Sequence, residues 1–176
     1  MLVLESPLIT ACGAQRNITK EVSITEAELS SDNILAIIAK HTKVIEINPQ
    51  LATAYYNRGF AKGQSGDHQG AIADYSKAIE INPRLATAYS NRGIAKKNLK
   101  DYQGAIADYS KAIEINPQDV NDYYNRGNAK SDLNDYQGAI ADYSKAIEIN
   151  PQDADAYSNR GSIKYYLEDF QGAIAD

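Results

Sequence analysis

The chain of 176 residues carries 23 acidic and 18 basic side chains, a net charge of −5, and this acidic balance argues against a nucleic-acid-binding surface. The single cysteine, Cys12, excludes an internal disulfide, and no apolar run approaches the roughly 18 residues that a membrane helix needs. We therefore expect a cytoplasmic protein with no membrane span and with no nucleic acid among its partners.

The first 33 residues show no repeat. Residues 1–11 are apolar but are interrupted by Glu5 and Pro7 and lack a basic start, which makes them a poor match to a secretory signal peptide. The stretch Ile9-Thr10-Ala11-Cys12 resembles the lipobox of bacterial lipoproteins, so export as a lipoprotein through Cys12 is the alternative to a cytoplasmic location. We interpret residues 1–33 as a disordered, non-repeat extension.

Residues 34–51 predict a single helix. Residues at helical spacing are predicted to form one stripe, the buried face of this helix: Ile34, Ile37, Ile38, His41, Val44 and Ile45. The segment ends in a blurred copy of a sequence that returns downstream. We interpret it as a degenerate half repeat that covers the apolar front of a stack of repeats.

One sequence block then repeats letter for letter. Gly70–Pro83 returns as Gly104–Pro117 and as Gly138–Pro151, an offset of 104 − 70 = 34 positions each time. A fixed period of this length is typical of stacked repeat architectures. Within the block the spacing of apolar residues indicates a helix that starts after the cap Asp67 and ends before the proline: Ala71, Ile72, Tyr75, Ala78 and Ile79.

The other half of each period predicts another helix, such as residues 52–65. A glycine recurs near its middle, at Gly59, Gly93, Gly127 and Gly161. Glycine inside a helix costs about 1 kcal/mol relative to alanine, so a gain must offset this cost in every repeat. We expect that gain to be the close approach of the partner helix.

A helix pair with this period and pattern resembles the tetratricopeptide repeat (TPR). The residues that carry the resemblance in the first repeat are Tyr55, Gly59, Ala71, Tyr75, Ala78 and Pro83. Where the family usually has leucine before the first glycine, this chain has Arg58, Arg92, Arg126 and Arg160. The resemblance implies an all-α fold, a right-handed superhelical solenoid of antiparallel helix pairs.

The resemblance also divides the chain into repeats. Three are complete, at residues 52–85, 86–119 and 120–153, and residues 154–176 form a truncated fourth. A stack normally continues or ends in a polar cap. We therefore expect the chain to be a fragment of a longer protein, or to self-associate through its open C-terminal repeat.

The sequence shows no pattern typical of a catalytic or metal-binding site. The two histidines, His41 and His68, stand at repeat positions that aromatic residues fill elsewhere, which favours packing roles. The repeated aspartates recur because the repeat recurs, so they do not indicate an acid–base pair. We predict no enzyme activity, no cofactor and no metal.

In the family that the sequence resembles, the first helix of each repeat lines a concave groove. The second helices are identical from repeat to repeat while the groove positions vary, as expected for a scaffold with a tailored surface. The peptide-binding site carried over from the family comprises one asparagine in every repeat and a set of neighbours: Asn57, Asn91, Asn125 and Asn159, with Tyr56, Phe60, Tyr124, Asn128, Tyr165 and Tyr166.

The asparagine and arginine rows suggest different roles. An amide offers both a donor and an acceptor, so the asparagines would hold the backbone of an extended ligand while the aromatic side chains anchor it. The alternative is that the asparagines stabilise helix packing. For the arginines we expect ion pairs with the second helices rather than an anion-binding row, at Asp74, Asp108, Asp142 and Asp176.

The sequence thus predicts a protein–protein interaction module that binds a peptide or protein segment in the concave groove. The carboxylate clamp that some family members use for acidic C-terminal tails is not expected, because its positions hold Tyr56, Phe60, Asn121 and Asn125. The alternative function is a structural or self-associating repeat segment of a longer multidomain protein.

Overall fold

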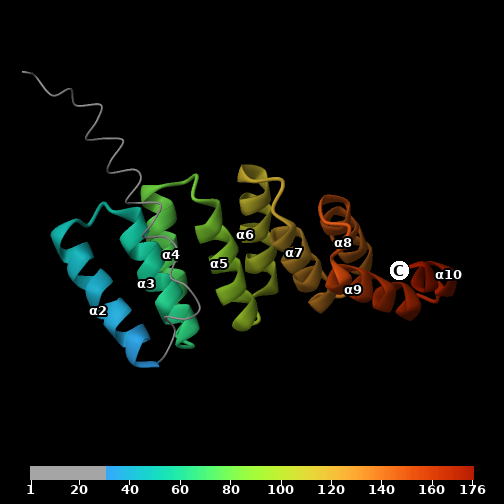
Figure 1. Cartoon of the computed structure of the whole chain (residues 1–176), viewed down its shortest axis with the longest axis horizontal. Helices are drawn as coiled ribbons and strands as arrows, with labels where there is room; N and C mark the ends of the chain where they lie inside the picture. The colour runs from blue at the N-terminus through green and yellow to red at the C-terminus, as the bar shows by residue number, and fades with distance from the viewer. Residues whose placement is uncertain (1–30) are drawn as a thin grey trace, which may run out of the picture.

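The computed structural model describes residues 31–176, and this part of the chain consists of helices joined by short turns (Figure 1). A first helix, α2, precedes four helix pairs that follow one another along the long axis of the molecule. The bounds are α2 Ser31–Ile47, α3 Ala52–Gln64, α4 His68–Ile81, α5 Ala86–Asn98, α6 Tyr102–Ile115, α7 Val120–Asp132, α8 Tyr136–Ile149, α9 Ala154–Tyr166 and α10 Phe170–Ala175. The extension expected over residues 1–33 lies almost wholly outside the described residues.

Each second helix of a pair starts at an aspartate cap. The Asp67 carboxylate accepts a hydrogen bond from the Gly70 N–H at 2.8 Å, and the same cap recurs at Asp101, Asp135 and Asp169. The helix α4 ends at Asn82, which is extended (φ −130°, ψ 91°) because Pro83 disfavours a helical conformation in the residue before it. The helix predicted from the repeated block is therefore confirmed.

The glycine in the middle of each first helix lets the two helices of a pair approach closely. A Cβ atom on Gly93 would lie 2.8 Å from Cε1 of Tyr109, and one on Gly127 would lie 2.8 Å from the same atom of Tyr143. Carbon atoms do not approach so closely, so the aromatic ring of the second helix occupies the space that a side chain would need. This confirms the expected close approach.

An arginine-centred network joins each pair to the preceding one. In the second repeat, the Nε and Nη2 atoms of Arg92 donate to the Asp108 carboxylate at 2.8 and 2.6 Å, and the Lys96 ammonium lies 2.8 Å from the same carboxylate. The Nη1 atom donates to the Ser76 hydroxyl of the previous pair at 2.9 Å, and the guanidinium lies over the Tyr89 ring. The network recurs around Arg58, Arg126 and Arg160, which confirms the predicted pairing with the second helices.

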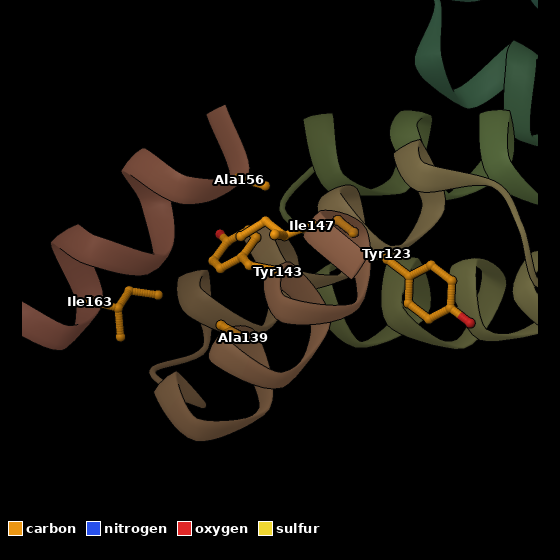
Figure 2. Close-up of a cluster of buried hydrophobic side chains, with 7 residues drawn as sticks. Tyr123, Ala139, Tyr143, Ile147, Ala156 and Ile163 are labelled. Carbon is orange, nitrogen blue, oxygen red and sulfur yellow. The ribbon is translucent and has the colours of Figure 1, made fainter. Parts of the chain in front are cut away.

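The core consists of small and aromatic side chains between successive helices. Figure 2 shows its C-terminal part, where the Tyr143 ring lies between its own repeat and the next one. The Ala156 side chain of α9 is completely buried in this cluster. Since the contacts run between neighbours along the stack, each pair depends on the pair beside it for the burial of its apolar surface.

The helix α2 packs on α3 as each later second helix packs on the following first helix. Its stripe is buried or half-buried, with Ile34 and His41 the most enclosed. The Thr42 hydroxyl accepts from Arg58, in the place that Ser76 takes for Arg92. The helix spans Ser31–Ile47 and thus includes the stripe predicted for it.

Candidate functional site

The first helices form the inner side of the stack. Contacts link α3 to α5 and α5 to α7 directly, past the second helices that lie between them in the sequence. A cavity of about 160 Å³ opens between α3 and α5, and its walls include Phe60, Asn91 and Ile94. A larger cavity of about 360 Å³ opens between α7 and α9, beside Asn128 and Asn159. Phe60, Asn91, Asn128 and Asn159 therefore line cavities on this inner side, and we call the surface that these cavities form the groove.

Two members of the asparagine row are held by the repeat before them. The Asn91 amide donates to the Tyr56 hydroxyl at 2.9 Å, and the Asn159 amide donates to the Tyr124 hydroxyl at 3.1 Å. The Asn159 amide also donates to the Asn128 carbonyl oxygen at 3.1 Å. In these two repeats the asparagine ties consecutive repeats together, which is the role that the packing alternative assigned to the row.

Asn125 lies in a different environment. Tyr56 and Tyr124 provide the hydroxyl acceptors for Asn91 and Asn159. At the equivalent position of the repeat that precedes Asn125, the residue is Ser90. Ser90 instead donates to the carbonyl oxygen of Ala86 at 3.2 Å. Within residues 31–176 the Asn125 amide makes no hydrogen bond, and its side chain is partly exposed. Asn125 is therefore the member of the row whose amide is available to a ligand.

The first asparagine of the row, Asn57, is buried, with an exposed fraction of 2 %. It lies between α2 and α3 beside His41, at a small cavity of about 20 Å³. A peptide in the groove would meet little of this side chain. The four asparagines, equivalent in the sequence, thus differ in what they can contact.

The predicted aromatic anchors also differ in exposure. Tyr56 is 8 % exposed and packs its ring 5.8 Å from that of Tyr75, so it belongs to the core more than to the surface. Tyr124 is half-buried and packs in the same way on Tyr143, at 5.9 Å. Phe60 is half-buried in the wall of the cavity between α3 and α5.

The remaining two anchors, Tyr165 and Tyr166, lie at the C-terminal end and are 66 % and 68 % exposed. Tyr165 packs edge-on against Phe170, with ring centroids 5.4 Å apart. The rings of Tyr165 and Phe170 and the exposed Ile174 border a cavity of about 560 Å³ on α9 and α10, whereas the Tyr166 ring packs on Tyr136, with centroids 5.0 Å apart. We call this surface the C-terminal face. It corresponds to the surface on which, in the earlier repeats, the next first helix packs.

The groove carries few charges. Lys97 and Asp132 line the cavity between α7 and α9, and neither forms an ion pair within the part of the chain that the structure describes. No group of three or more histidine, cysteine or acidic side chains in residues 31–176 is arranged to hold a metal ion. No helix in that range is long and apolar enough to cross a membrane.

The sequence analysis overlooked one residue, Asp122. It takes the position of Ala54, Ala88 and Ala156 in the other repeats and is 1 % exposed. In the part of the chain that the structure describes, neither carboxylate oxygen has a hydrogen-bond partner. Burial raises the pKa of Asp122 to about 6. The signal in the sequence is the one aspartate at a repeat position that otherwise holds alanine.

The stacked helix pairs and their inner groove define a helical repeat solenoid. The chain belongs to the tetratricopeptide repeat family: a TPR repeat model matches residues 62–100 and 127–168, and two tetratricopeptide repeat models match residues 86–119 and 109–141. The expected fold class, an all-α right-handed solenoid of antiparallel helix pairs, is confirmed. Members of the family are generally non-catalytic interaction scaffolds. The fold of this chain is therefore that of a protein-interaction module. Comparison with curated proteins finds no significant match.

Several solved structures share the fold. The crystal structure of MamA has a TM-score of 0.81 and 23% identity, over 87% of this chain and 90% of that one. YrrB, described as a TPR protein with an unusual peptide-binding site, has a TM-score of 0.73 and 19% identity, over 97% and 88%. The first TPR of Spaghetti (RPAP3), bound to the HSP90 peptide SRMEEVD, has a TM-score of 0.65 and 26% identity, over 66% and 93%.

Proposed function

We propose that this protein binds an extended peptide along the groove, with the central contact at Asn125. The observation that carries the proposal is the difference within the asparagine row. Asn91 and Asn159 donate to tyrosine hydroxyls of the preceding repeats, whereas the partly exposed Asn125 amide makes no hydrogen bond within residues 31–176. An amide pairs as donor and acceptor with one peptide group, which suits recognition of a ligand backbone.

The residues around Asn125 also support a peptide contact at this position. Ser90 is smaller than the tyrosines at its equivalent positions, so it leaves more room beside Asn125 than a tyrosine would. The cavities on either side along the groove give room for side chains of a ligand, with Phe60 and Ile94 in one and Lys97 and Asp132 in the other. Two proteins of similar fold are described with peptides, RPAP3 as bound to one and YrrB as having an unusual peptide-binding site, which supports the proposal.

The chemistry of the groove also limits which peptides fit. A tail rich in carboxylates, such as SRMEEVD, needs several cations along the groove, and the two cavities offer only Lys97. We therefore propose that this peptide binds at least 100-fold more weakly than the best uncharged peptides. Equal affinity for SRMEEVD would contradict this part of the proposal.

The test uses the full chain and heptapeptides selected on it from a random phage-displayed library, with affinity measured by calorimetry. Replacing Asn125 by Ala should weaken binding about tenfold, since one amide pair is worth on the order of 1.4 kcal/mol. The control is Gln103→Ala on the exposed surface of α6, which should leave affinity unchanged. Failure to select any peptide, or equal affinity of the Asn125→Ala variant, would contradict the proposal.

A second candidate function is self-association through the C-terminal face. The exposed side chains of Tyr165, Phe170 and Ile174 support it, because exposed apolar clusters are typical of interaction surfaces. Light scattering at increasing concentration should then show a rising mass that Ile174→Asp abolishes. The matched control is Ile47→Asp, which changes an equally exposed isoleucine at the other end of the stack. A constant monomer mass for the unmodified chain would exclude this candidate.

A further inference from the structure

The interfaces between successive repeats follow one pattern, and the middle interface departs from it at two positions. Between the first and second repeats a tyrosine, Tyr56, lies near an alanine, Ala88, and the two share one core cluster. Between the third and fourth repeats the corresponding residues are Tyr124 and Ala156. Between the second and third repeats they are Ser90 and Asp122. The middle interface therefore has a hydroxyl in place of a ring and a carboxylate in place of a methyl group.

This double change interrupts the hydrophobic core. The clusters on either side each combine tyrosines and alanines from two consecutive repeats. The cluster at the middle interface contains only Ala105, Tyr109 and Ala129 as buried members. The middle interface thus buries fewer apolar side chains than its neighbours, and it holds a buried carboxyl group, Asp122, where they hold Ala88 and Ala156.

The polar groups at this interface are not matched to one another. Among the described residues, both carboxylate oxygens of Asp122 and the hydroxyl oxygen of Tyr109 are buried without a hydrogen-bond partner. The two side chains lie close enough for the charge of Asp122 to raise the pKa of the Tyr109 phenol further, beyond the larger effect of burial. A buried polar atom that lacks a partner destabilises the folded state.

Within residues 31–176 no cation forms an ion pair with the Asp122 carboxylate. It faces Asp119, the cap of its own helix, which has the same sign, and Arg126, whose Nε and Nη2 atoms are already bound to Asp142 at 2.9 and 2.7 Å. From α6 it faces the Tyr109 phenol, and from α5 it faces the uncharged Ser90. An ionised Asp122 is therefore a buried charge without an ion-pair partner, which is among the least favourable arrangements in a protein interior.

We propose that the interface between the second and third repeats is a pH-sensitive joint, closed when the Asp122 carboxyl is protonated and loosened when it ionises. The protonated carboxyl is neutral, so the closed interface encloses no unpaired charge, and its O–H can turn toward the neighbouring Ser90 hydroxyl. After ionisation the charge gains solvation only if α7 moves away from α5 and α6. The stack would then bend between two halves that keep their own cores.

The direction and the pH range of the effect follow from the titration. Burial is the main reason that the pKa of Asp122 rises from 3.8 to about 6, and Ser90 and Arg126 offset part of that rise. The open joint, in which the carboxyl is solvated, binds the proton more weakly than the closed one. The equilibrium constant for opening should therefore increase as pH rises from about 4 to about 6, by up to roughly tenfold per unit and by about a hundredfold in total. Above that range it should stay constant.

The experiment measures this opening in the full chain by amide hydrogen exchange between pH 4 and pH 8, corrected for the intrinsic exchange rate. Amides of α6 and α7 should lose about a hundredfold in protection across the range in the unmodified chain. The amides of α8 should change much less and serve as an internal reference. The variant Asp122→Asn, which is uncharged at every pH, should lose the pH dependence, and this comparison also removes any contribution of His41 and His68.

Two further measurements keep the proposal open to contradiction. If Asp122→Asn folds poorly, Asp122→Ala provides the same test with the residue that the other repeats use. Independently, the ¹³C shift of the Asp122 carboxyl reports its pKa directly in the unmodified chain. A carboxyl that titrates below about pH 4.5, or an equal loss of protection in the uncharged variants, would overturn the proposal.

Discussion

The Asn91 amide and the Tyr56 hydroxyl are joined by a hydrogen bond of 2.9 Å across the interface between the first and second repeats. The two residues are 35 positions apart in the sequence, so the bond forms only when the repeats stack. Together with the packing of the Tyr56 ring on Tyr75, it makes a groove residue part of the interface. Stability and ligand binding are therefore not separate properties along the inner face of this protein.

Replacement of Tyr56 by Phe tests this bond. The ring and its packing remain, but the Asn91 amide loses its acceptor, so the free energy of unfolding should fall by about 1 kcal/mol. Urea unfolding followed by circular dichroism measures the change. The control is Tyr102→Phe, because the Tyr102 hydroxyl has no hydrogen bond among the described residues and its loss should change stability little. Equal effects of the two variants would show that the bond contributes nothing measurable.

The buried ion pairs of the arginine network should matter far more than the exposed ones. Asp108 is 3 % exposed and pairs with Arg92 and Lys96, so Asp108→Ala leaves two partly buried cations without a partner. We expect a loss of about 3–5 kcal/mol in the free energy of unfolding. The control is the exposed pair of Lys111 and Glu114, where solvent screens the ion pair and Lys111→Ala should change stability far less. Chemical unfolding of the two variants decides, and similar losses would contradict the expectation.

The sequence predicts those features of the structure that depend on residues within one repeat better than those that depend on contacts between repeats. The helices, their aspartate caps and the approach at Gly93 were predictable because the period and the local spacing contain them. The same is true of the pairing of Arg92 with Asp108, since both recur at one offset.

The candidate site was less predictable than the fold. The asparagine row looks uniform in the sequence, yet the environment of each amide depends on a residue of the preceding repeat. Asn91 has a tyrosine hydroxyl as its partner, whereas Asn125 has Ser90 in that place. The burial of Tyr56 in the core likewise depends on how two repeats pack, which a single repeat does not reveal.

The glycine of the second repeat provides a test of the close approach between helices. In Gly93→Ala the new Cβ would lie 2.8 Å from the Tyr109 ring, so the ring or the helix must shift. We expect destabilisation by about 1–3 kcal/mol, despite the helix-forming preference of alanine. The control is Gly63→Ala, where the nearest atom would be 3.7 Å away and the substitution should stabilise by up to about 1 kcal/mol. Thermal unfolding should shift in opposite directions for the two variants, and a shift in the same direction would be a contradiction.

Replacement of the buried carboxyl tests how the middle interface affects stability. Folding raises the pKa of Asp122 from 3.8 to about 6, so the folded state binds this proton more tightly than the unfolded state does. The free energy of unfolding of the protein therefore falls as pH rises through that range, and it remains lower at pH 7. A rise of about two units corresponds to on the order of 3 kcal/mol. In Asp122→Ala that penalty disappears, but a small void remains beside Ser90, so we expect a net gain of about 1–2 kcal/mol at pH 7.5.

The double variant Ser90→Tyr with Asp122→Ala should be more stable still, because it restores the tyrosine and alanine of the neighbouring interfaces and offers the Asn125 amide a hydroxyl acceptor. Urea unfolding at pH 4.5 and pH 7.5 should show a smaller difference between the two pH values for both variants than for the unmodified chain. Because the new ring would also fill the space beside Asn125, peptide affinity in the double variant should fall while stability rises. A double variant that gained stability and kept full affinity would place the ligand contact away from Asn125.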